Sequence, residues 1–255
     1  MGKGSGIYCT EGAVVTITNN DIDLHTYGIY GYGYAPPPTL IITGNTITSN
    51  TDSGIYLRAY TTSWDGPVAT INNNNIYGNT NYELQTGLYK NAKTTVLNAR
   101  NNWWGTTDPI SIASKIYDFS DYINYPVVDY SSFLDAPGGT PITSGYRMGW
   151  VSSDTTWPVS ESPIVVLGKV MVDTNATLTI ESGTELKFIN SDHFFEVNGR
   201  LIADNVTFTS NEAFPSAGDW WGIEFTPESN YKDSSVTNWT IEYSQYGIYL
   251  DSTSA

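Results

Sequence analysis

Short alternating runs of apolar and polar residues recur along the first hundred residues of the chain. Each run of aliphatic and β-branched residues leads into a polar corner, where an asparagine stands two places before the next apolar residue. These asparagines are Asn20, Asn45, Asn74 and Asn102, with spacings of 25, 29 and 28 residues. Period-two alternation in short runs predicts β-strands, and a repeat of about 25 residues predicts one structural unit per interval.

A second repeated element is the tripeptide Gly-Ile-Tyr, which begins at Gly6, Gly28, Gly54 and Gly247. Tyr82-Glu83-Leu84 occupies the next equivalent place after Gly54. If each interval forms one turn and the turns stack, like strands pair in parallel at about 4.8 Å and their side chains alternate inward and outward. One interior column then contains Ile7, Ile29, Ile55 and Leu84, and a second contains Val15/Ile17, Leu40/Ile42, Ala69/Ile71 and Leu97/Ala99.

The corner asparagines suit such a stack. Asparagine tolerates left-handed backbone and can hydrogen-bond the same side chain one turn away, which forms a ladder. These repeats resemble the right-handed parallel β-helix repeats of secreted and cell-surface, adhesin-like proteins of bacteria and archaea, within the pectin-lyase-like superfamily. The resemblance implies an all-β, right-handed parallel β-helix (solenoid), and the handedness also follows the general preference for right-handed parallel crossovers.

The chain is expected to contain two stretches of this solenoid. Residues 1–105 are predicted to be the closing turns of one β-helix, because the sequence NNWWG that ends them resembles the end of such a solenoid. Residues 106–145 are predicted to form a short helix, capped by Asp108 and extending to Tyr117, and then a Pro/Gly-rich linker. Residues 146–255 resemble the cap and opening turns of a second β-helix.

The charge balance argues against several partners. Lys plus Arg number 11 against 26 Asp plus Glu, and the net charge of −15 repels phosphate backbones and anionic membrane surfaces. Nucleic acid is therefore not expected as a partner, and no run of about 18 apolar residues is present to insert into a membrane. Cys9 is the single cysteine, so no disulfide can form within the chain, and strand alternation places its side chain inside.

An extracellular or cell-surface location is expected. The start of the sequence lacks the apolar core of a secretory signal. Either a native leader lies outside this sequence, which the composition favours, or the protein is not exported by that route. Asn175, Asn205 and Asn238 each begin an Asn-X-Thr sequon and are the candidate glycosylation sites. Sequons also arise by chance in a chain this rich in Asn and Thr.

The sequence offers little for catalysis. Asn50-Thr51-Asp52 resembles a tripeptide of the polygalacturonase-like hydrolases, in which paired aspartates act as acid and base. The aspartate pair, the His-Gly element and the Arg-x-Lys element of that family are missing here, so no catalytic residue and no cofactor is predicted. Calcium is possible but not indicated, because no aspartates have the spacing of a dedicated loop; the acidic candidates are Asp21/Asp23, Asp118/Asp121 and Asp219.

Outward-facing tyrosines form the candidate binding surface. Because the isoleucine of Gly-Ile-Tyr points inward, Tyr8, Tyr30 and Tyr56 are predicted to point outward on one face, as is Tyr249 in the second solenoid. Such a column can stabilise its own sheet as a cross-strand ladder, contact another protein, or stack on sugar rings. The sequence leaves all three alternatives open.

The predicted function is structural, as a subunit or segment of an extracellular filament, sheath or adhesin. Both ends of the sequence interrupt a coil, so the solenoid ends are expected to stack head to tail on other copies or on flanking turns of a larger chain. The alternative is a carbohydrate-active or carbohydrate-binding β-helix of the polysaccharide lyase or hydrolase type. Acidic and basic side chains converging on one outer face would favour that alternative.

Overall fold

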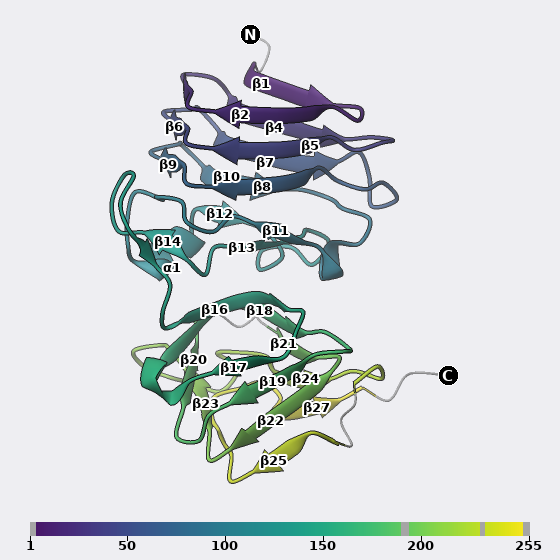
Figure 1. The fold of residues 1–255 in the computed structure, drawn as a ribbon, viewed down its shortest axis with the longest axis vertical. Coiled ribbons are helices and arrows are strands. Elements are labelled where there is room, and N and C mark those ends of the chain that lie inside the picture. Colours follow the sequence, from purple (N-terminus) through teal and green to yellow (C-terminus); the bar gives the residue numbers. More distant parts are fainter. Residues whose placement is uncertain (1–3, 190–193, 230–232, 252–255) are drawn as a thin grey trace. The chain divides into compact units, whose positions relative to one another are not determined.

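A computed structural model describes residues 4–189, 194–229 and 233–251 of the chain (Figure 1). The chain divides into two compact units, Met1–Thr143 and Ser144–Ala255. Short strands paired in parallel build nearly all of both units, so the predicted parallel β-solenoid is confirmed. The strands that one turn of the chain contributes are called a rung below.

Three parallel sheets form the body of the first unit, and successive rungs add strands to them in rotation (Figure 1). The first sheet contains β1 (Ser5–Thr10), β4 (Tyr27–Gly33), β7 (Ser53–Ala59), β10 (Tyr82–Thr86) and β12 (Ile116–Tyr117). The second contains β2 (Val14–Thr18), β5 (Thr39–Thr43), β8 (Val68–Asn72), β11 (Val96–Asn98) and β13 (Val127–Asp129). The third contains β3 (Asp21–Asp23), β6 (Thr46–Thr48) and β9 (Asn75–Tyr77), and a 3₁₀ turn, η1 (Ala92–Thr94), precedes β11.

The strand registers confirm the predicted interior columns. Ile7, Ile29, Ile55 and Leu84 pair in that order along the first sheet, and the last three are fully buried. In the second sheet Ile17, Ile42 and Ile71 pair and are buried in the same way. Cys9 lies inside as predicted, buried and opposite Gly31.

The corners of the first unit divide two tasks between neighbouring residues. The left-handed backbone falls on Asn19, Gly44, Asn73 and Asn101, whose φ angles are 57°, 69°, 57° and 57°. The residue after each of these is a ladder asparagine. The N–H and Nδ2 of the first three, Asn20, Asn45 and Asn74, donate to the Oδ1 of the next asparagine at 2.9–3.0 Å. The sequence analysis assigned the left-handed backbone and the ladder hydrogen bond to the same asparagine. In the structure the left-handed residue turns the chain, and the side chain of the following asparagine points along the stack.

The segment after residue 105 contributes more than the predicted helix and linker. Helix α1 (Pro109–Ala113) begins as expected, with the Ser111 N–H donating to Asp108 Oδ2 at 3.0 Å. The helix stops at Ala113 instead of Tyr117, because Ile116 is buried beside Leu84 and extends the first sheet as β12. Strand β13 extends the second sheet in the same way, and β14 (Phe133–Leu134) pairs antiparallel with β15 (Pro141–Ile142).

The second unit is built from two parallel sheets. The larger contains β16 (Tyr146–Val151), β18 (Ile164–Val172), β20 (Glu185–Phe188), β21 (Phe194–Val197), β23 (Thr207–Ser210), β24 (Gly222–Phe225), β26 (Thr240–Ile241) and β27 (Ile248–Leu250). The smaller contains β17 (Thr155–Trp157), β19 (Thr177–Ile180), β22 (Arg200–Asp204) and β25 (Ser235–Thr237), and a 3₁₀ turn, η2 (Val159–Glu161), follows β17.

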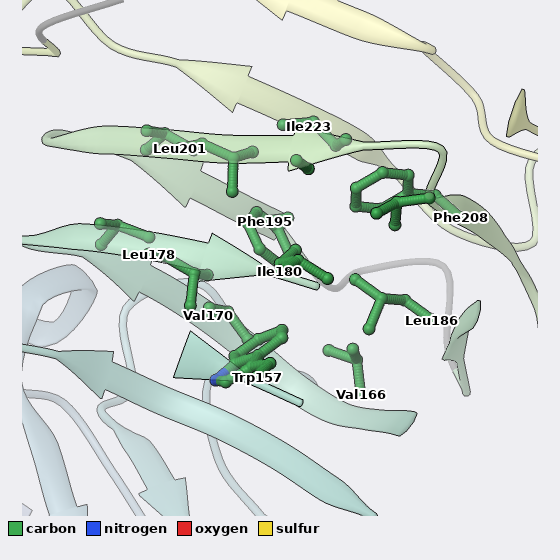
Figure 2. Close-up of a cluster of buried hydrophobic side chains, with 14 of the residues drawn as sticks. Trp157, Val166, Val170, Leu178, Ile180, Leu186, Phe195, Leu201, Phe208 and Ile223 are labelled. Atoms are coloured by element: carbon green, nitrogen blue, oxygen red, sulfur yellow. The ribbon is translucent and has the colours of Figure 1, made fainter. Parts of the chain in front are cut away.

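Strand β18 joins two parts of the larger sheet. Its residues Ile164–Val166 pair with β20, whereas Val170–Val172 pair with β21. Side chains from these strands meet in one aromatic and aliphatic core (Figure 2), where the ring of Phe195 contacts Trp157 and Phe208 edge to face. Each sheet turns its inner face toward the other sheets, so the apolar and aromatic side chains on that face are removed from water. Their burial is the main source of stability of a parallel coil.

Candidate functional site

The predicted tyrosine column lies on the outer face of the first sheet. Tyr8, Tyr30 and Tyr56 pair in register on β1, β4 and β7, and the column continues through Gln85 to Tyr117. Adjacent ring centroids lie 5.3 Å apart for Tyr8 and Tyr30 and 5.2 Å for Tyr30 and Tyr56, the second pair being parallel to within 6°. The rings therefore stack on one another along the solenoid, which is the geometry of a cross-strand ladder.

A fourth ring, which the sequence analysis did not include, packs against this column. Tyr27 lies at the start of β4, with its centroid 5.4 Å from Tyr30 and 5.2 Å from Tyr56. We call Tyr8, Tyr27, Tyr30 and Tyr56 the tyrosine cluster. Burial among these rings raises the pKa of Tyr30 to about 12, whereas Tyr8 is 56% exposed. The cluster thus has one accessible ring and one ring enclosed by its neighbours.

More aromatic rings continue the surface beyond the cluster. Tyr30 contacts Tyr32 edge to face, and the contacts proceed through Tyr60 to Tyr34, which stacks on Trp64 at 4.7 Å. The guanidinium of Arg58 lies 5.9 Å from the Tyr32 ring and donates to the carbonyls of Ala59 and Tyr60. This part of the first unit therefore presents an extended aromatic surface with one cation on it.

Polar groups border the tyrosine cluster around Asp52. The carboxylate Oδ1 of Asp52 accepts from Asn81 Nδ2 at 3.2 Å, and the Ser53 hydroxyl lies 3.1 Å away. The same hydroxyl lies 2.9 Å from Gln85 Oε1, so its single proton can serve only one of the two oxygens. Burial raises the pKa of Tyr27, and the negative charge of Asp52 raises it further. A carboxylate, an amide and phenol hydroxyls thus meet beside the stacked rings.

Asn50, the first residue of the hydrolase-like tripeptide, has a structural role. Its side chain is fully buried and belongs to a second ladder, in which the His25 N–H donates to Asn50 Oδ1 at 3.1 Å. Asn50 Nδ2 in turn donates to Asn79 Oδ1 at 2.9 Å. Asn50 and Asp52 are therefore not brought together as a catalytic pair, because their side chains face the interior and the outer surface respectively.

The second ladder ends on a buried carboxylate that the sequence analysis treated only as a variant of Gly-Ile-Tyr. Asn79 Nδ2 donates to Glu83 Oε2 at 2.5 Å, and burial raises the pKa of Glu83. Lys115, on the next rung, donates from Nζ to the carbonyls of Asn79, Thr80 and Asn81 at 3.2–3.4 Å. Asn50 and Asn79 each stand three residues before a strand of the first sheet, β7 and β10 respectively, and this shared position could have indicated the ladder from the sequence.

The remaining predicted residues lie in the second unit. Tyr249 is 40% exposed on β27, and its ring lies 5.4 Å from Trp221. Asn175 is exposed in the turn before β19. Asn205 and Asn238 are exposed at left-handed corners with φ angles of 53° and 54°, so all three sequon asparagines are on the surface. Their glycosylation stays a prediction.

Three of the acidic residues considered for calcium, Asp118, Asp121 and Asp219, accept hydrogen bonds from the protein itself, whereas Asp21 and Asp23 are exposed on β3. Asp118 is buried and accepts from the N–H groups of Ser120 and Val128 at 2.9 and 2.8 Å, and burial raises its pKa to about 7. Asp219 accepts from Ser210 Oγ and Ser216 Oγ at 2.7 and 2.8 Å. Within the described residues, no group of three His, Cys, Asp or Glu side chains is arranged to hold a metal ion.

A pocket of about 360 Å³ opens beside the second sheet, between the loops that carry Pro67 and Tyr89. Val68, Val96 and Leu97 line it together with Lys90. The buried Tyr89 hydroxyl donates to the Pro67 carbonyl at 3.0 Å, so it is occupied in holding the two loops together. The pocket lies beside the second sheet, whereas the tyrosine cluster lies on the first.

Residues 2–118 match the family model described as the right-handed β-helix region. The matched residues contain strands β1–β12 of the first unit, so this part of the chain is similar to that family. The parallel registers of β1–β12 agree with the match, and the match supports the right-handed coil that the sequence analysis took from resemblance. β-Helices of this kind include enzymes and proteins without catalytic activity, so the family alone does not assign a function.

A curated relative also shares part of the sequence. The chain is 28% identical over 121 residues to "Protein bark beetle" of Drosophila melanogaster, an alignment that covers 42% of this chain and 4% of the relative. The chain thus spans a small fraction of that protein's length. No solved structure gives a significant match. Among the described residues, no helix is both long and apolar enough to span a membrane.

Proposed function

We propose that this chain is a structural β-helix segment of an extracellular or cell-surface protein, which acts by presenting surfaces and not by catalysis. The observation that carries the proposal is the use of polar side chains inside the coil. Two ladders of buried hydrogen bonds run along the first unit, and the second includes Asn50 of the hydrolase-like tripeptide. Polar groups that hydrogen-bond one another in a buried ladder make the stack rigid, and they do not reach a substrate at the surface.

We further propose that another rung pairs with the open edge formed by β1, β2 and β3, as in a filament or sheath. Each ladder asparagine donates to the next Oδ1 along the stack, so the ladder has a direction. Asn20 is its exposed first member, and no donor from the described residues reaches its Oδ1. A rung that carries an amide at the same place would complete the ladder and cover the exposed edge.

Sedimentation velocity and negative-stain electron microscopy over a concentration series test pairing between copies. Linear assemblies are expected to appear as the concentration rises, because a head-to-tail contact does not close on itself. Asn20→Arg should abolish them by placing a charge on the open edge, whereas Asn72→Arg, on the outer face of β8, should leave them unchanged. Monomers of the unmodified chain at every concentration would exclude pairing between copies.

Carbohydrate binding at the tyrosine cluster is the second candidate function, favoured by the polar groups around Asp52. Sugars are bound by aromatic rings together with carboxylate and amide groups, and Asp52, Gln85 and Asn81 supply these beside Tyr56. The net charge of −15 favours neutral over anionic glycans.

Affinity electrophoresis through gels that contain neutral or anionic polysaccharides tests this candidate. Retardation by a neutral glycan is expected, and Tyr56→Ala should weaken it about tenfold through loss of one ring contact. Tyr77→Ala, which removes an exposed tyrosine of the third sheet, is the matched control and should bind normally. Equal mobility in all gels would contradict carbohydrate binding and leave the structural proposal untouched.

A further inference from the structure

The rings of the tyrosine cluster lie close enough to react with one another. Tyr30 is at the centre, with centroid separations of 5.3 Å to Tyr8, 5.4 Å to Tyr27 and 5.2 Å to Tyr56. Tyr27 and Tyr56 are also 5.2 Å apart. Tyr8, Tyr30 and Tyr56 leave consecutive parallel strands in register, so their rings are neighbours along the stack.

We propose that the tyrosine cluster is an oxidative cross-linking site, at which hydrogen peroxide and a haem peroxidase join neighbouring rungs through dityrosine bonds. Two phenols each lose one electron and one hydroxyl proton to give phenoxyl radicals. The radicals combine through ring carbons ortho to oxygen, and the hydrogen atom on each coupled carbon then moves to the phenol oxygen. One hydrogen peroxide takes up the two electrons and two protons and becomes two water molecules.

The arrangement of the cluster favours coupling within one chain over coupling between chains. Tyr8 is 56% exposed and can meet the oxidant, whereas Tyr30 is half-buried between its neighbours. A radical formed at Tyr8 therefore has a second phenol 5.3 Å away before it meets another molecule. Holding two reactants in contact turns a bimolecular step into a unimolecular one and raises its rate by orders of magnitude.

Such a bond would supply what the cysteine content cannot. Cys9 is the single cysteine of the chain, so the rungs cannot be joined to one another by disulfides. A link between Tyr8 and Tyr30 would attach β1, the edge strand of the first sheet, covalently to β4. A cross-link that closes a loop of this size restricts the unfolded chain and raises the unfolding temperature. Such cross-linking requires neither assembly between copies nor carbohydrate binding.

Treatment of the purified, dilute chain with a haem peroxidase and limiting hydrogen peroxide tests the proposal. Expected results are dityrosine fluorescence, a mass loss of about 2 Da per link in the monomer, and cross-linked peptides that join Tyr8 to Tyr30 or Tyr30 to Tyr56. Tyr30→Phe leaves one of the four ring pairs and should reduce the yield to roughly a quarter. Tyr77→Phe, outside the cluster, should react like the unmodified chain.

Three results would overturn the proposal. The first is a product that consists mainly of covalent dimers on a denaturing gel. The second is a set of cross-linked peptides that maps elsewhere, for example to Tyr122 and Tyr125, whose centroids are 4.9 Å apart. The third is an unchanged monomer yield in Tyr30→Phe, with circular dichroism showing that this variant is folded.

Discussion

Replacement of Asn74 by alanine is expected to lower the free energy of unfolding of the first unit by about 3–5 kcal/mol. Asn74 is fully buried, and its Oδ1 accepts from the N–H and the Nδ2 of Asn45, both at 3.0 Å. Its own Nδ2 donates to the Ile42 carbonyl at 2.9 Å and to Asn102 Oδ1 at 3.0 Å. Alanine removes these four hydrogen bonds, leaves the buried Asn45 N–H without its acceptor and opens a small cavity. Urea unfolding followed by circular dichroism measures the loss.

Two further variants separate the ladder from general packing. Asn20→Ala removes the exposed end of the same ladder and should cost about 1 kcal/mol or less, because water can replace the lost bonds. Asn74→Asp keeps the shape of the side chain but buries a charge and removes the donor, so it should be least stable at high pH. An Asn74→Ala cost no larger than that of Asn20→Ala would show that the buried ladder does not stabilise the stack.

The parts of the fold that repeat in sequence could be predicted from it. Alternation fixes which residues face inward once the strand positions are known, and Ile29 and Ile55 are buried in register as the spacing required. The first ladder was equally visible, because the same residue type recurs at one place in every rung. The end of the helix could not be predicted in this way. Burial of Ile116 beside Leu84 outweighs the local preference for helix, and this contact between distant residues is not visible in a single sequence.

The second ladder was missed because its members differ in type. The ladder runs from the His25 N–H through Asn50 and Asn79 to Glu83, which lies on the same rung as Asn79, so only two of its side chains are asparagines. Resemblance drew attention to Asn50 as part of a hydrolase-like tripeptide, whereas its neighbours on adjacent rungs decide its role. A polar residue at a corner can thus be assigned only after the rungs are aligned, since the hydrogen-bond partner is about 29 residues away.

The candidate surface was predicted in part. The alternation within Gly-Ile-Tyr correctly placed Tyr8, Tyr30 and Tyr56 in one column, with contacts between adjacent rings. Tyr27 could not be placed by alternation, because it lies where the chain leaves a corner and the period-two rule does not yet apply.

Replacement of Gly54 by alanine should destabilise the first unit by about 2–5 kcal/mol, although it adds a single methyl group. A Cβ at Gly54 would lie 2.7 Å from Asn79 Nδ2 and 2.8 Å from the Glu83 carbonyl oxygen, both on the next rung. Neither atom can move freely, because the amide holds the second ladder and the carbonyl belongs to strand β10. The rungs must therefore separate locally, which weakens the hydrogen bonds of Asn79, and urea unfolding is again the measurement.

Gly247→Ala is the matched control, because Gly247 begins the same Gly-Ile-Tyr tripeptide but a Cβ there would meet no atom within 4 Å. Its effect should stay within about 0.5 kcal/mol, the usual range for an unobstructed surface position. A large loss in Gly54→Ala beside a small one in Gly247→Ala would show that the glycine makes room for the ladder amide of the next rung. Equal losses would instead assign the repeated glycine to backbone flexibility, and the ladder would no longer explain the tripeptide.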